Sequence, residues 1–138
     1  MKESTLQCHV ADYLRLQYPH VLFHSDYGSG IKLTPGQAAK QKRQNGGRRA
    51  WPDMFIACVR TIGDRYYHGL FLELKREGTR IIKKDGKLVA DQHIREQHAL
   101  LVELERRGYA ARFAVGFDQA KQIIDWYLGG SNEEMMEF

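Results

Sequence analysis

Apolar residues along this chain recur at two spacings, one typical of helices and the other typical of strands. Between Glu3 and Gln17 they recur every three or four residues, which predicts an amphipathic helix that ends before Pro19. Three further helices are predicted, over Pro35 to Gln44, Gln92 to Arg107 and Asp118 to Leu128. Gly108 marks the end of the longest one, because glycine readily adopts the backbone conformation that follows a helix.

Short runs rich in β-branched and aromatic residues lie between these helices and predict strands. The runs are Val21 to Ser25, Asp53 to Val59, Tyr66 to Lys75 and Tyr109 to Val115. Gly63 and Asp64 predict the turn of an antiparallel hairpin between the second and third runs, which would form the centre of a sheet. The segment from Gly78 to Asp91 is predicted to be a basic loop or a small β-excursion around Asp85 and Gly86. This order of elements is typical of a mixed α/β sandwich.

Composition places the chain among ordinary globular proteins. Its 138 residues are 43% hydrophobic and 28% charged, which predicts a single domain over residues 1–138, with 129–138 as a flexible acidic tail. No apolar run is long enough for a membrane span, and no apolar segment follows Lys2 as in a secretory signal, so we expect a cytoplasmic protein. Cys8 and Cys58 lack the paired spacing of zinc clusters, and we expect both to be buried free thiols.

Positive charge is concentrated in the middle of the chain, although the net charge is only +4. Between Asp26 and Asp53 there is no acidic residue but there are six basic ones: Lys32, Lys40, Lys42, Arg43, Arg48 and Arg49. Such a run is either a solvated surface or a contact surface for a polyanion, and charge alone does not separate the two. The glycines at 28, 30, 46 and 47 form no phosphate-binding loop, since neither pair leads into a GK[ST] ending, so we expect no nucleotide cofactor.

The tetrapeptide Leu72-Glu73-Leu74-Lys75 carries two charges inside an otherwise apolar strand. Because side chains alternate across a strand, Glu73 and Lys75 share one face and the leucines share the other. An unpaired ion in the middle of a sheet costs several kcal/mol. The pair is therefore either a solvated pair on an edge strand or a functional pair that binds something.

A second carboxylate, Asp53, follows Pro52 at the start of the neighbouring predicted strand. If the two strands pair, Asp53 can approach Glu73 at one end of the sheet. Two adjacent carboxylates repel each other unless a cation lies between them. Carboxylate and backbone carbonyl oxygens, completed by waters, suit Mg²⁺ or Mn²⁺.

Pro52-Asp53 followed by Glu73-x-Lys75 resembles the signature of PD-(D/E)XK nucleases, and the wider frame resembles their virus-type replication-repair subfamily, the VRR-NUC domain. The features that carry this resemblance are Glu3 on the first helix, Gly47, the strand from Gly69 to Lys75, Gln97, and Gly108 with Tyr109. Together they cover nearly the whole chain. The resemblance implies a restriction-endonuclease-like core, with a mixed β-sheet flanked by helices.

The resemblance also implies an activity, that of a Mg²⁺-dependent endodeoxyribonuclease in which Mn²⁺ can replace Mg²⁺. Asp53, Glu73 and the Leu74 carbonyl would bind the metal, and Lys75 would orient the attacking water and offset negative charge. Glu3 would be a further metal carboxylate or else an ordinary residue of a helix N-terminus. Gln97 would contact the water or the phosphate, or else lie on a helix surface. His93 and His98 are interpreted as structural or surface residues.

Stand-alone VRR-NUC proteins of phages and bacteria are homodimers acting on branched DNA such as Holliday junctions, so the resemblance implies the same partners here. The six basic residues between positions 32 and 49 would then contact DNA phosphates. Tyr27 and Trp51 are candidates for stacking on a base, with a buried tryptophan as the alternative for Trp51. Two other functions stay open, a DNA-junction-binding module that does not cleave and a nuclease acting on flaps or single strands.

Overall fold

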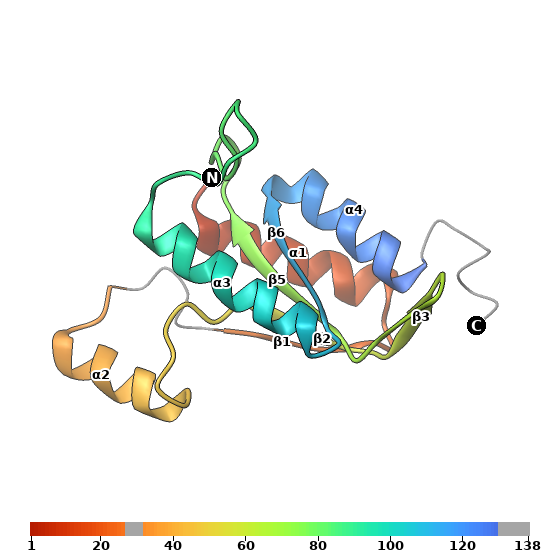
Figure 1. Ribbon diagram of the computed structural model, residues 1–138. Coiled ribbons are helices and arrows are strands. Elements are labelled where there is room, and N and C mark those ends of the chain that lie inside the picture. The colour runs from red at the N-terminus through yellow and green to blue at the C-terminus, as the bar shows by residue number, and fades with distance from the viewer. Residues whose placement is uncertain (27–31, 130–138) are drawn as a thin grey trace.

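The computed structural model describes residues 1–26 and 32–129, so the predictions for Tyr27, Gly28, Gly30 and the tail beyond Gly129 lie outside the described residues. The elements in chain order are α1 (Glu3–Gln17), β1 (Leu22–Ser25), α2 (Pro35–Gln44), β2 (Met54–Ala57), β3 (Arg60–Ile62), β4 (Arg65–Tyr67), β5 (Leu70–Lys75), α3 (Gln92–Arg106), β6 (Ala110–Val115) and α4 (Gly116–Leu128). Figure 1 shows α3 on one side of the sheet and α1 with α4 on the other. The predicted mixed α/β sandwich is confirmed.

The main sheet has the strand order β1-β2-β5-β6. Strand β2 is antiparallel to both of its neighbours, whereas β6 lies parallel to β5 because α3 carries the chain across the sheet between them. The pair β2 and β5 therefore forms the centre of the sheet, as predicted.

The connection between these central strands differs from the prediction. Gly63 and Asp64 turn a separate two-stranded hairpin, in which Arg60 pairs with Tyr67 and Ile62 with Arg65. The run predicted from Tyr66 to Lys75 is interrupted, because the His68 backbone N–H donates to the Gly108 carbonyl at 2.8 Å. One predicted strand is thus two, β4 and β5.

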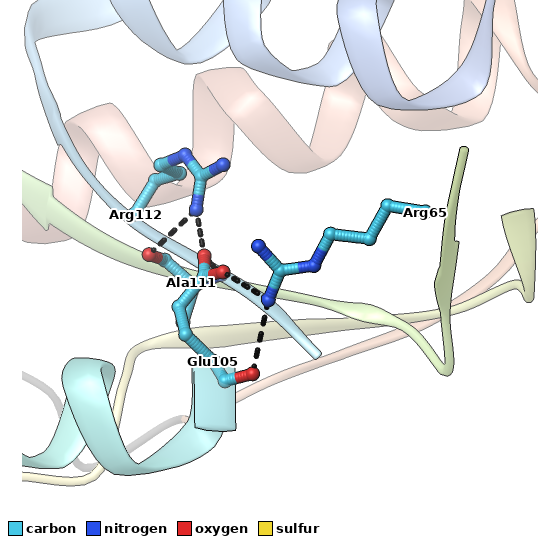
Figure 2. A network of polar contacts seen from close by, with 4 residues as sticks. All are labelled: Arg65, Glu105, Ala111 and Arg112. Carbon is cyan, nitrogen blue, oxygen red and sulfur yellow. Dashed lines mark hydrogen bonds and ion pairs between the residues drawn. The ribbon is translucent and has the colours of Figure 1, made fainter. Parts of the chain in front are cut away.

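The inserted hairpin is tied to the rest of the molecule through Glu105 at the end of α3. Arg65 of β4 forms an ion pair with Glu105 at 3.1 Å, and Arg112 of β6 pairs with the same carboxylate (Figure 2). Glu105 also accepts a hydrogen bond from the Ala111 backbone N–H at 2.8 Å. One partly buried carboxylate thus joins α3, β6 and the hairpin.

The main core lies between the sheet and the helices α1 and α4. Leu70, Leu72 and Leu74 of β5 are at most 1% exposed and pack against α1 and α4 residues such as Leu6 and Ile124. On the other face, Phe71 packs against the apolar residues of α3, Leu100, Leu101 and Leu104. The alternation predicted for this strand is therefore observed, with Glu73 and Lys75 on the α3 face beyond Phe71.

Helices α1 and α2 have the predicted bounds, and those of α3 and α4 differ by one or two residues. Thr34 closes the N-terminus of α2 with a capping box to Gln37, directly before the proline in its first turn. Gly108 adopts φ +97° after α3, as expected of a residue that ends a helix. In the loop after β5, Ile82 and Leu88 form the small β-excursion around Asp85 and Gly86.

One prediction about the cysteines is wrong. Cys8 is exposed, because α1 turns Leu6, Val10 and Leu14 toward the core and places Cys8 off that face. Cys58 is half-buried, and both residues are free thiols. Within residues 1–26 and 32–129, none of the helices has the length and apolar character that crossing a membrane requires.

Candidate active site

The register of the two central strands brings Asp53 and Glu73 together. Met54 pairs with Leu72, so the next position outward places Asp53 opposite Glu73. Asp53 is held at both ends, since its backbone carbonyl accepts from the Asp26 N–H at 2.8 Å and its Oδ2 accepts from the Leu74 N–H at 2.7 Å. The aspartate is thereby fixed between the ends of β1 and β5.

Glu73 and Lys75 lie inside the protein and not on an exposed edge. Their exposed fractions are 3% and 6%, and β5 has β2 on one side and β6 on the other. The alternative of a solvated pair on an edge strand is therefore wrong. A carboxylate and an ammonium group on one face of an interior strand require partners of opposite charge or a bound ligand.

The electrostatics of Glu73 reflect this enclosure. Burial raises the pKa of Glu73 to about 10, and the Asp53 carboxylate adds to the rise through its charge and a hydrogen bond. The charge of Lys75 opposes the rise, whereas that of Glu3 increases it. At neutral pH the acidic pair therefore retains a proton unless a cation takes its place.

Gln97 of α3 lines the same pocket as Glu73 and is buried, with 4% of its surface exposed. Its Nε2 atom lies 3.1 Å from Nε2 of His93, one helical turn earlier. Its Oε1 atom is the one buried side-chain oxygen or nitrogen without a hydrogen-bond partner among the described residues. The alternative of a residue on the helix surface is wrong for Gln97.

These side chains line a pocket of about 560 Å³, and Glu3 lines it as well. The described part of the chain buries four charged or amide side chains: Asp53, Glu73, Lys75 and Gln97. All four line this one pocket. Burial of polar groups is expensive, so their concentration at one place indicates a functional site.

Sequence reasoning missed two titratable residues of the pocket lining, Asp26 and His93. His93 was interpreted as structural or as a surface residue; it is exposed, and it also lines the pocket and contacts Gln97. Its position four residues before Gln97 was an available signal, because residues four apart share one face of a helix. No comparable local pattern points to Asp26, which lies beside Asp53 through strand pairing.

The predicted basic residues divide into two groups. Lys42, Arg48 and Arg49 line the pocket, together with other residues of the arm formed by α2 and the segment up to Ala50. Lys32, Lys40 and Arg43 do not line it, although Arg43 borders a neighbouring hollow with Lys42 and Arg49. No residue of α2 is buried, and Figure 1 shows this helix standing apart from the sheet.

Trp51 connects this arm to the sheet, and it is partly exposed to solvent. It is 37% exposed, its indole N–H donates to the Asn45 carbonyl at 3.3 Å, and its ring lies 6.3 Å from that of Phe71. The alternative of a buried tryptophan is therefore wrong, and Trp51 lines the pocket.

The donor atoms fit a hard divalent cation. Asp53 and Glu73 offer carboxylate oxygens, and their mutual repulsion is relieved when a cation replaces the retained proton. Within the described residues no three His, Cys, Asp or Glu side chains converge on one metal position. A cation bound by the pair would therefore take its remaining ligands from backbone carbonyls, water or substrate.

Comparisons with known proteins bear on the fold. No family model matches the chain, and no curated protein matches it. A solved structure described as "VRR_NUC domain protein" superposes with a TM-score of 0.63 and 24% sequence identity, over 94% of this chain and 90% of that one. The fold implied by the resemblance is confirmed: this chain has the fold of a VRR-NUC domain, a PD-(D/E)XK-like core with a mixed sheet flanked by helices.

Proposed function

We propose that this protein is a metal-dependent endonuclease that hydrolyses phosphodiester bonds in DNA. The observation that carries the proposal is the burial of Asp53, Glu73 and Lys75 side by side in a pocket with a basic wall. Two carboxylates and an amine in a protected hollow suit the hydrolysis of a phosphate diester. The basic wall suits a polyanionic substrate.

Asp53 and Glu73 would hold Mg²⁺ or Mn²⁺, with the Leu74 carbonyl as a further ligand. Glu3 lines the same pocket and would act on a second metal ion or through the ligands of the first. The bound ion would polarise the scissile phosphate and acidify a water molecule. In hydrolysis the water oxygen forms a bond to phosphorus, one bridging P–O bond breaks, and the leaving oxygen gains a proton. The buried ammonium group of Lys75 would orient the water and offset the negative charge that develops on the phosphoryl oxygens.

The arm carrying Lys42, Arg48 and Arg49 would hold the DNA backbone over the site. Lysine and arginine contacts to phosphates position a duplex without reading its sequence. Lys32, Lys40 and Arg43 would extend the same contact along the backbone beyond the pocket.

Branched DNA, such as a Holliday junction, is the proposed substrate, and a homodimer is the proposed assembly. Two symmetric cuts in a four-way junction require two active sites related by a twofold axis. A nuclease for flaps or single strands would share this chemistry. A binding module that does not cleave is disfavoured, because Asp53, Glu73 and Lys75 are all present and buried together.

The test incubates the purified protein with a labelled four-way junction, a flap and a linear duplex, in Mg²⁺, Mn²⁺ or EDTA. We expect cleavage in either metal and none in EDTA, with the junction cut fastest. Asp53→Asn and Lys75→Ala should abolish cleavage and leave junction binding largely intact. Asp64→Asn, which makes the same change at an exposed site, serves as the control. Cleavage at the wild-type rate by either site variant contradicts the proposal.

A further inference from the structure

Gln97 presents an unusual imbalance, since one end of its carboxamide is held and the other is not. Nε2 lies 3.1 Å from Nε2 of His93, whereas Oε1 is buried and lacks a partner among the described residues. Leaving a buried acceptor unpaired is unfavourable, so native proteins rarely do it without a ligand or water to complete the bond. The pocket shared with Asp53 and Glu73 is where such a partner would enter.

The chemistry of the free atom narrows the identity of that partner. A carboxamide oxygen only accepts hydrogen bonds, so its partner must donate one. The non-bridging oxygens of a phosphodiester carry no proton and cannot donate. Water can. Oε1 of Gln97 is therefore suited to hold a water molecule and unsuited to hold the phosphate group.

The contact with His93 bears on which end of Gln97 is available. The structure turns the amide Nε2, which can only donate, toward the imidazole Nε2, and this arrangement requires the tautomer that carries the ring proton on Nδ1. With Nε2 engaged in this way, Oε1 is the end left for a molecule in the pocket. Without an acceptor at position 93, the carboxamide can rotate by half a turn and present its NH₂ group instead.

We propose that His93 is a positioning residue that holds the Gln97 carboxamide so that Oε1 accepts a hydrogen bond from the attacking water. The inference rests on the proposed nuclease function and assigns a role to a residue outside the Asp53, Glu73 and Lys75 set. The sequence left two partners open for Gln97, the water and the phosphate, and this inference selects the water. In this proposal His93 acts through Gln97.

The test is a double-mutant cycle on the DNA substrate that the wild-type protein cleaves fastest. His93→Phe keeps a ring but removes the acceptor, and the loss of one hydrogen bond of ordinary strength corresponds to about a tenfold decrease in kcat. KM should stay unchanged, because phosphate contacts remain. His93→Gln can accept through its side-chain oxygen and should recover most of kcat. In the absence of Gln97 the His93 change should have no effect, so Gln97→Leu and the double variant should be equally slow.

His98 provides a matched control on the same helix. It is exposed like His93 but lines a different hollow, which Arg80 and Phe113 also line. His98→Phe should cleave at the wild-type rate. Melting temperatures of all variants, measured in EDTA, establish that each is folded before its kinetics are compared.

Three results would overturn the inference while leaving the proposed nuclease function intact: a wild-type rate for His93→Phe, a His93→Gln variant as slow as His93→Phe, or a His93 effect that multiplies that of Gln97→Leu. Failure of the wild-type protein to cleave any DNA in Mg²⁺ or Mn²⁺ overturns the nuclease function and this inference together. The rate pattern across the variants thus distinguishes the two failures.

Discussion

Replacing Glu73 with glutamine should stabilise the metal-free protein while destroying its proposed activity. Glutamine has nearly the shape of glutamate but carries no proton that the folded state must retain. In the wild type, burial and the Asp53 charge raise the pKa of Glu73 to about 10, from an ordinary value of 4.5. The folded chain therefore keeps a proton at neutral pH that the unfolded chain releases.

The size of the effect follows from this difference in proton binding. Between pH 4.5 and pH 7, each pH unit removes about 1.4 kcal/mol from the free energy of unfolding of the wild type. The loss at pH 7 is about 3 kcal/mol. Its sign is fixed, since the unfolded state binds fewer protons and stability must fall as pH rises through this window. Glu73→Gln removes the loss.

The assay is urea unfolding of both proteins in EDTA at several pH values from 5 to 8. The stability advantage of Glu73→Gln should be small at pH 5 and widen by about 1.4 kcal/mol per pH unit. Glu77→Gln makes the same change on an exposed residue and should give no such trend. Adding Mg²⁺ should narrow the gap, because the ion stabilises the folded wild type and not the variant.

Two results would refute this reasoning. If Glu73→Gln is no more stable than the wild type in EDTA at pH 7, the carboxyl is not held neutral in the folded state. If the gap exists but does not change with pH, the stabilisation comes from packing and not from proton retention.

Two further predictions concern the arm and the far side of the molecule. Neutralising Lys42, Arg43, Arg48 and Arg49 should weaken DNA binding, as measured by fluorescence anisotropy. The slope of the logarithm of the binding constant against the logarithm of the salt concentration should become shallower by about 0.9 for each DNA phosphate that is no longer neutralised. An unchanged slope would mean that these basic residues form only a solvated surface. At Asp125, burial alone would raise the carboxyl pKa, but hydrogen bonds from Tyr13, Tyr18 and Lys121 lower it. Asp125→Asn should therefore destabilise the protein by roughly 1–3 kcal/mol at pH 7, an effect that shrinks as pH falls below 4, whereas exposed Asp118→Asn should have little effect.

The sequence predicted those features that are determined by residues close together along the chain. The bounds of α1 follow from its own apolar spacing and Pro19, and those of α2 from its capping residues and proline. The meeting of Asp53 with Glu73 was also predictable, because strand alternation and one pairing register determine it. The hairpin inserted between β2 and β5 was not, since its separation from β5 depends on a backbone bond from His68 to the distant Gly108.

The same distinction explains why the pocket could be predicted only in part. Lys75, Glu73 and Asp53 lie in short motifs, whereas Asp26 enters the site by pairing with the Asp53 backbone. A chain selected for stability alone would fill the α3 face beyond Phe71 with apolar side chains, as it does on the opposite face with Leu70, Leu72 and Leu74. It instead buries two acids, an amine and a half-satisfied amide there. The stability gained by Glu73→Gln would measure directly what that one exception costs, and simultaneous loss of cleavage would identify the function for which it is retained.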